Sequence, residues 1–270
     1  MRFLLLCLVC LTACADANVT ASAQSGAGTT ATTAAAASRA PSTQAFARVL
    51  QAYLRRGGRF DYAGLSADSA RRADLDAYLA AVGHACVDGW SRDEQLAFYL
   101  NAYDALVIHA VLRRWPIQSV MHEDGFFGRD SYTVAGQTMT LDQLENQIIR
   151  GPRFAEPRIH FAVNCASVGC PRLWPTPFSA QNLEAELERC ARAFVRQSTS
   201  VNRETRHVRL SKLFSWFARD FGSAGGVGAF VARYLDPEDA AVARDPSATL
   251  DFDDYDWAIN APSASQGAHR

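Results

Sequence analysis

The stretch that most constrains the fold is residues 91–113, a long helical pattern that is apolar on most of its faces. Ser91 and Glu94 have the spacing of a capping box at its start, and Trp115-Pro116 ends it. A helix on the surface of a domain keeps one broad polar face towards water. This pattern has no such face, so we predict a central helix that the rest of the domain encloses.

Shorter patterns surround this helix. Further helices are predicted over residues 43–56, 68–81, 140–150, 182–197, 211–220 and 227–234, with a hairpin at 131–139 and a strand at 207–210. The aromatic, acidic segment 250–260 is expected to fold back onto the domain. Because the strands are few and scattered among helices, we predict an α+β fold. It would be a single mixed domain with a buried central helix and a small, mainly antiparallel sheet.

The N-terminus has the pattern of a secretion signal. Residues 1–13 comprise a charged start, a short apolar run and small residues. Residues 11–14 resemble a bacterial lipobox, so we expect Cys14 to become the lipidated N-terminus; an ordinary secretion signal cleaved nearby is the alternative. Ala15 resembles the residue that directs lipoproteins to the outer membrane. We therefore expect a lipid anchor on the periplasmic face of the outer membrane, in the bacterial cell envelope.

Composition divides the rest of the chain. Residues 14–41 are mostly Ala, Thr, Ser and Gly and predict a disordered tether, residues 42–260 suit one globular domain, and residues 261–270 predict a disordered tail. The net charge is −1, which argues against a nucleic-acid partner. No phosphate-binding glycine loop is present in the sequence, and we predict no cofactor.

Residues 159–171 concentrate chemically active side chains in a short stretch. Apolar residues alternate at 159, 161 and 163, which predicts a strand with His160 and Asn164 on its opposite face. A turn is predicted at Gly169-Cys170-Pro171. An imidazole, an amide and thiols would therefore meet at the end of a buried strand, so this block is the candidate site.

Four cysteines follow the lipobox: Cys86, Cys165, Cys170 and Cys190. In an oxidising compartment they favour disulfides, and their pairing is open. A local Cys165–Cys170 bridge is sterically possible. A zinc site is less favoured, because His160 and the two nearby thiols lack a fourth ligand. We predict no metal site.

Polar residues on two helices complete the candidate set. Asn101 and Asp104 lie on one face of the central helix, where they either satisfy loop backbone groups or bind a ligand. Together with Tyr103 and Ser167 they are our candidate binding residues. Glu145 is either a solvated carboxylate at a helix start or the group that orients His160.

Several blocks resemble the uncharacterised family catalogued as domain of unknown function 547. They are residues 95–106, 141–150, 157–171, 210–217 and 255–260. The family usually has Trp, Asn and His where this chain has Tyr99, Asp104 and Asn146, which puts in doubt any mechanism that needs a histidine at position 146. The resemblance implies no activity. By analogy the layout looks distantly like papain and transglutaminases, but the central helix does not begin with their cysteine.

Two functions fit these residues. In the one we favour, the chain is an envelope lipoprotein that binds a protein, peptide or glycan through a cleft around residues 160–171, and a Cys165–Cys170 bridge clamps the turn. The alternative is a thiol-dependent hydrolase or acyltransferase acting on peptide-like bonds. There Cys165 or Cys170 would be the nucleophile and His160 the base, oriented by Glu145 or Asn164.

The hydrolase hypothesis also requires an oxyanion site, and the two cysteines allow a third hypothesis. In the hydrolase, backbone amides near Val168 would bind the oxyanion. A thiol–disulfide exchanger is a third, less favoured hypothesis. Four residues separate Cys165 from Cys170, whereas redox motifs usually have two, and no thioredoxin-like pattern surrounds them.

Overall fold

A computed structural model describes residues 40–262, with helix α4 (Arg92–Leu112) at the centre of the fold. Ser91 and Glu94 form the predicted capping box, in which the Ser91 backbone N–H donates to Glu94 Oε2 at 2.8 Å. By length and composition alone α4 could span a membrane, but 89% of its apolar window is buried within the domain. The predicted enclosed central helix is therefore confirmed.

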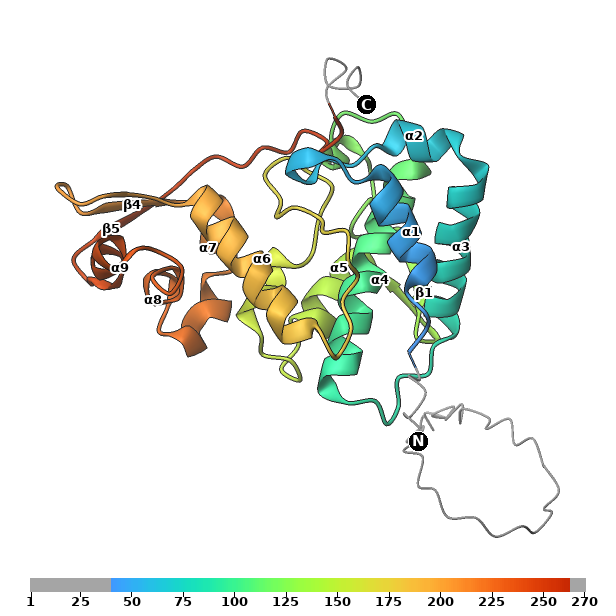
Figure 1. The fold of residues 1–270 in the computed structure, drawn as a ribbon, viewed down its shortest axis with the longest axis horizontal. Coiled ribbons are helices and arrows are strands. Elements are labelled where there is room, and N and C mark those ends of the chain that lie inside the picture. The colour runs from blue at the N-terminus through green and yellow to red at the C-terminus, as the bar shows by residue number, and fades with distance from the viewer. Residues whose placement is uncertain (1–39, 263–270) are drawn as a thin grey trace, which may run out of the picture. The chain divides into compact units, whose positions relative to one another are not determined.

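The N-terminal helices pack beside α4. They are α1 (Gln44–Tyr53), α2 (Tyr62–Ala67) and α3 (Ser69–His84), with a short turn, η1 (Arg56–Gly58), after α1. Figure 1 shows α1 and α3 running alongside each other next to α4. Asp61 and Asp68 cap α2 and α3 by accepting backbone N–H groups. Thr43 precedes α1 as predicted but makes no capping hydrogen bond through its side chain.

A hairpin follows the turn η2 (Val120–His122). Its strands β1 (Ser131–Val134) and β2 (Gln137–Thr140) pair antiparallel in the predicted register around Ala135-Gly136. Both turn residues have positive φ, 50° and 73°, which is the two-residue turn that matches strand twist. A second capping box at Thr140 then opens α5 (Leu141–Gln143), which continues as the π-helical segment η3 (Leu144–Ile149).

The strand predicted at residues 159–164 is wrong. Residues Pro157–Phe161 form a 3-10 helix, η4, because Pro157 has a helical φ and the Glu156 side chain accepts the N–H of Arg158 at 3.0 Å. His160 and Asn164 therefore do not share a strand face. Every residue from Ile159 to Asn164 is buried, on all sides of the segment, so the apolar alternation did not mark an inner and an outer face.

The second half of the domain combines helices with a small sheet. It contains α6 (Leu183–Ser198), α7 (Lys212–Trp216), η5 (Ala218–Ala224), α8 (Val227–Val231) and α9 (Pro237–Arg244). Strands β3 (Ser200–Asn202) and β4 (His207–Leu210) pair antiparallel, and β5 (Thr249–Phe252) joins β4 in parallel. The α+β class is confirmed, with the hairpin and this sheet as two separate sheets. A cluster of phenylalanine rings joins η4 to these helices: Phe161, Phe194, Phe214, Phe221 and Phe230.

The C-terminal segment after β5 folds back onto the domain, as predicted. Ser167 pairs with Ile259, and Val168 and Gly169 donate their N–H groups to the carbonyls of Ala258 and Asp256 at 2.8 and 2.9 Å. A Cβ on Gly169 would lie 3.1 Å from the backbone and ring of the returning chain, which explains the glycine there. The tail thereby brings its aromatic residues beside the candidate site.

Candidate functional site

The predicted site residues meet at a cavity of about 510 Å³, which we call the His160 cavity. Its wall comes from α4, η2, α5, η3, η4, the loop after η4, α7 and the C-terminal segment. Five of the predicted residues line it: Tyr103, Glu145, His160, Cys165 and Cys170. The imidazole and both sulfurs therefore share one hollow. Asn101, Asp104, Asn164 and Ser167 are not among its lining residues.

His160 is held by a carboxylate that the sequence analysis did not identify. Its Nε2 lies 2.7 Å from Asp220 Oδ2 on η5, and its ring stacks on Phe217 with 4.1 Å between centroids. Since the carboxylate accepts, Nε2 carries the hydrogen in the neutral ring and Nδ1 is left as an acceptor. Nδ1 is buried and has no hydrogen-bond partner among residues 40–262. Burial lowers the pKa of His160, against the opposing effect of Asp220, so the imidazole is neutral at neutral pH.

Arg150 completes this cluster from the end of η3. Its Nε donates to Asp220 Oδ2 at 2.8 Å, and its guanidinium lies 4.6 Å above the Phe217 ring. The hydrogen bond from His160, followed by that from Arg150, lowers the pKa of Asp220. Asp220 is therefore a fixed negative charge that sets the tautomer and the orientation of the imidazole.

Glu145 does not orient His160. Tyr103 donates its hydroxyl to Glu145 Oε2 at 2.8 Å, because η3 packs against α4 at this point. Burial raises the pKa of Glu145. The two carboxyl groups thus have different environments: Asp220 is ionised and paired, whereas Glu145 keeps a proton to higher pH and faces the cavity beside a phenol.

Cys165 and Cys170 form the local disulfide that the sequence left as one of several pairings. The Cys165 N–H donates to Cys170 Sγ at 2.8 Å, and Cys165 Sγ lies 3.0 Å from Ser167 Oγ and 3.3 Å from the Tyr255 hydroxyl. Cys190, on the buried face of α6, is a free thiol within the part of the chain that the structure describes. In this state neither sulfur of the bridge is a nucleophile.

The other predicted residues form a buried network that binds backbone. Asn101 pairs with both the N–H and the carbonyl of Phe178, at 2.9 and 2.8 Å. Asp104 accepts the N–H of Asn164 at 2.8 Å, and the Asn164 amide is bonded to Pro171, Ala166 and Asn260. The Asn164 side chain is thus fully used and does not orient His160. Likewise, the amides of Val168 and Gly169 donate to the tail, so they do not form an oxyanion hole.

Aromatic rings form one side of the His160 cavity. Trp216 of α7 lies 4.8 Å from the Tyr255 ring and 5.7 Å from the Trp257 ring, and Tyr255 lies 4.5 Å from Trp257. Trp216 and Met121 are the exposed large hydrophobic residues of the described part of the chain, at 46% and 55% exposure, and both line this cavity. We call Trp216, Tyr255 and Trp257 the aromatic wall.

The charges around the cavity have one sign. Asp142 and Glu145 line it, and no lysine or arginine is found among the lining residues that the structure describes. Asn146 also lines it and contacts Arg150. This lining favours a neutral or cationic ligand over an anionic one.

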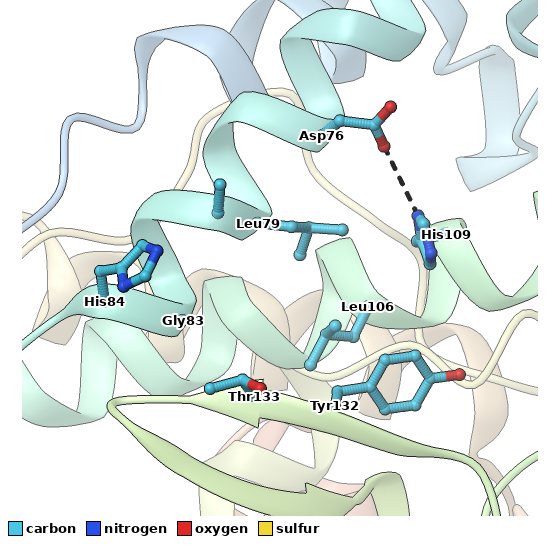
Figure 2. Close-up of a pocket in the computed structure, with 9 residues that line it drawn as sticks. Asp76, Leu79, Gly83, His84, Leu106, His109, Tyr132 and Thr133 are labelled. Atoms are coloured by element: carbon cyan, nitrogen blue, oxygen red, sulfur yellow. Dashed lines mark ion pairs between the residues drawn. The ribbon is translucent and has the colours of Figure 1, made fainter.

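A second cavity of about 350 Å³ lies between α3, α4 and β1. Figure 2 shows His109 facing Asp76, with 3.7 Å between His109 Nδ1 and Asp76 Oδ1, while His84 lies at the other end of the cavity. Within residues 40–262 no group of three His, Cys, Asp or Glu side chains is arranged to hold a metal ion. This cavity lacks the convergent hydrogen bonds and the cluster of rings that surround His160.

Asp220, Arg150, Phe217 and the aromatic wall were not predicted as site residues from the sequence. Asp220 is 60 residues from His160 along the chain and follows no recognisable motif. Trp216, Tyr255 and Trp257 lie in segments that were compared with a family, but no chemical role was assigned to them from the sequence. The Cys14 lipidation prediction and the tether lie outside the described residues.

Comparisons with known proteins agree with the resemblance over part of the chain. No curated protein and no solved structure matches the chain significantly. Trp216, Asp220 and the C-terminal segment lie beyond residues 87–195, the part of the chain that matches a family model. Residues 87–195, which carry α4, η3, η4 and most of α6, match the model of a family described as a protein of unknown function, DUF547.

Proposed function

We propose that this chain is a lipid-anchored protein of the bacterial cell envelope whose domain binds a glycan in the His160 cavity. The observation that carries the proposal is the aromatic wall, with an exposed Trp216, facing carboxyl and amide groups across one cavity. Ligand pockets typically combine apolar and aromatic lining with a few placed polar groups.

Sugar rings suit this combination. Each ring has an apolar face of C–H groups that packs on an aromatic ring, and hydroxyl groups around its edge. Asp142, Glu145 and Asn146 supply hydrogen-bond partners for those hydroxyls. The His160 ring also borders the cavity, where it packs flat on Phe217.

The test is a binding series with oligosaccharides of matched length and different charge. Tryptophan fluorescence is a direct reporter, because Trp216 and Trp257 line the cavity. We expect neutral N-acetylated oligomers and cationic amino-sugar oligomers to bind, and uronic-acid oligomers to bind at least about tenfold more weakly. If no glycan in the series binds, or if the uronic acids bind best, the proposal is wrong.

The location needs its own experiment. Signal-peptide and lipobox patterns at residues 1–14 support a lipid anchor. Cys14→Ser should abolish incorporation of labelled fatty acid and release the protein from the membrane fraction. Ala15→Asp, a matched change at the next residue, should keep the lipid and move the protein towards the inner membrane. Unchanged lipid labelling in Cys14→Ser would contradict the anchor.

A second candidate function is a thiol-dependent hydrolase or acyltransferase acting on peptide-like bonds. The observation that favours it is the His160–Asp220 pair beside two sulfurs in one cavity. It requires the reduced protein, since the disulfide has no nucleophile. Peptide thioesters should then be cleaved only after reduction, and Cys165→Ser should abolish cleavage while glycan binding is unchanged.

A further inference from the structure

The Cys165–Cys170 disulfide lies in the wall of a cavity instead of in the packed core. Both cysteines are partly exposed, and both line the His160 cavity. Exchange with an external thiol requires access to a sulfur, and buried structural bridges do not offer it. The accessible position distinguishes this bridge from a purely structural clamp.

Hydroxyl groups already surround Cys165 Sγ. Ser167 Oγ lies 3.0 Å and the Tyr255 hydroxyl 3.3 Å from this sulfur, and the two hydroxyls lie 3.1 Å apart. A disulfide sulfur can only accept hydrogen bonds, so a hydroxyl must donate. Burial raises the pKa of Tyr255 to about 12, so the phenol keeps its proton at neutral pH. A thiolate formed at Cys165 would find donors in place, and a stabilised leaving thiolate speeds exchange.

Cys170 borders two cavities, whereas Cys165 borders one and has both hydroxyls on its sulfur, so we take Cys170 as the attacked sulfur and Cys165 as the leaving one. Cys170 lines the His160 cavity and also a neighbouring cavity of about 40 Å³, which Cys190 borders. Cys190 is a free thiol, but burial raises its pKa to about 12, so it is protonated at neutral pH and is a poor nucleophile. The attacking thiol must therefore come from outside, through the His160 cavity.

We propose that the Cys165–Cys170 disulfide is an exchange site for a small neutral or cationic thiol. The external thiolate attacks Cys170 Sγ and forms a mixed disulfide, and the Cys165–Cys170 bond breaks with its electron pair going to Cys165. A second external thiol then attacks the external sulfur of that mixed disulfide and frees Cys170. Two thiols are oxidised to one disulfide, the bridge gains two electrons, and the two thiol protons pass to the two cysteines.

The ligand class follows from the size and charge of the cavity. A volume of about 510 Å³ suits a small molecule. Asp142 and Glu145 line it without a basic residue among the described lining, which disfavours an anionic thiol. Exchange at the disulfide and glycan binding are measured separately, by the rate of mixed-disulfide formation and by glycan affinity, so either proposal can fail alone.

The test compares cysteamine, a cationic thiol, with 3-mercaptopropionate, an anionic one, at equal thiolate concentration on the full mature chain. The reaction is quenched with N-ethylmaleimide and the peptides are mapped by mass spectrometry. We expect cysteamine on Cys170 and maleimide on Cys165 at early times, and a rate at least about fivefold higher for cysteamine. Cysteamine found first on Cys165, or equal rates for the two thiols, would overturn the proposal.

Two variants remove one hydroxyl each, and a third variant serves as the control. Tyr255→Phe keeps the ring and its packing, and Ser167→Ala removes the second donor; each should slow the first exchange step by about three- to tenfold. Cys190→Ser should leave the rate unchanged. Near-ultraviolet circular dichroism of the tryptophans checks that each variant is folded. Unchanged rates in folded Tyr255→Phe and Ser167→Ala, or slow exchange in Cys190→Ser, would contradict the assigned path.

Discussion

Two groups of polar residues near η4 differ in what they leave unbonded. The first, around Asn101, Asp104 and Asn164, is bonded to backbone and to itself. The second, around His160 and Asp220, lines a cavity and leaves a ring nitrogen without a partner. The difference indicates that the first group fixes the backbone around η4, whereas the second is placed to bind a ligand in the cavity.

We expect the largest effect on stability from a substitution in the first group, the residues around Asn164. Asn164→Ala removes three buried hydrogen bonds, to Pro171, Ala166 and Asn260, and leaves their partners unsatisfied. We expect the free energy of unfolding in urea to fall by about 3 kcal/mol. Asn146→Ala, at an exposed asparagine on η3, is the control and should change it by less than about 0.5 kcal/mol. Similar losses in both would erase the contrast between the groups.

The second largest effect is expected on glycan affinity, from a substitution of Trp216 in the His160 cavity. Trp216→Ala should weaken binding of a neutral oligosaccharide by about tenfold, because it removes a stacking surface, yet cost less than about 1 kcal/mol of stability. Trp216 is 46% exposed, which limits its contribution to the core. Trp216→Phe keeps an aromatic face and should retain most of the affinity in calorimetry. Full affinity in the alanine variant would remove Trp216 from the site.

The pH dependence of stability provides a third test. Burial raises the pKa of Asp104 well above its ordinary value. The folded state therefore holds this proton to higher pH than the unfolded state, and stability falls as pH rises from the unfolded pKa through the folded one. Asp104→Asn should gain on the order of 1 kcal/mol at pH 8 and nothing near pH 4. A loss at pH 8 larger than at pH 4 would contradict this.

The smallest effect is expected on the pKa of the His160 imidazole. Burial lowers the pKa of His160 while Asp220 opposes it, so Asp220→Asn should lower the pKa further, followed by NMR of the ring protons. Since the folded pKa is depressed, His160 contributes stability that is lost as pH falls below its unfolded pKa of about 6.5. Asp142→Asn serves as the control. A rise in the pKa after Asp220→Asn would rule out the pairing.

Local signals explain what could be predicted. The helix from Arg92 was predictable because the capping box and its apolar faces lie within one segment. The segment at His160 was not, because its apolar alternation suggested a strand, whereas Pro157 and the Glu156 cap start a 3-10 helix. Alternation marks a strand only when one face meets solvent, and here both faces are buried.

Prediction of the site residues from the sequence was limited in the same way. His160, Glu145 and the two cysteines could be found from residue chemistry, since they lie in or near one block. Asp220 could not be found that way, because only the packing of η5 against η4 brings it to the imidazole. Asn164 and Glu145 were both expected as groups that orient His160, and neither does. Spacing along the chain does not reveal which neighbour a buried carboxylate or amide meets.

The most direct test of the central claim is an NMR titration of the indole N–H groups with a neutral N-acetylated oligosaccharide. The chain has five tryptophans, of which Trp216 and Trp257 line the His160 cavity. We expect these two signals to shift, while Trp90, Trp115 and Trp174 stay in place. Shifts confined to the other three, or no shift at saturating sugar, would contradict glycan binding at this cavity.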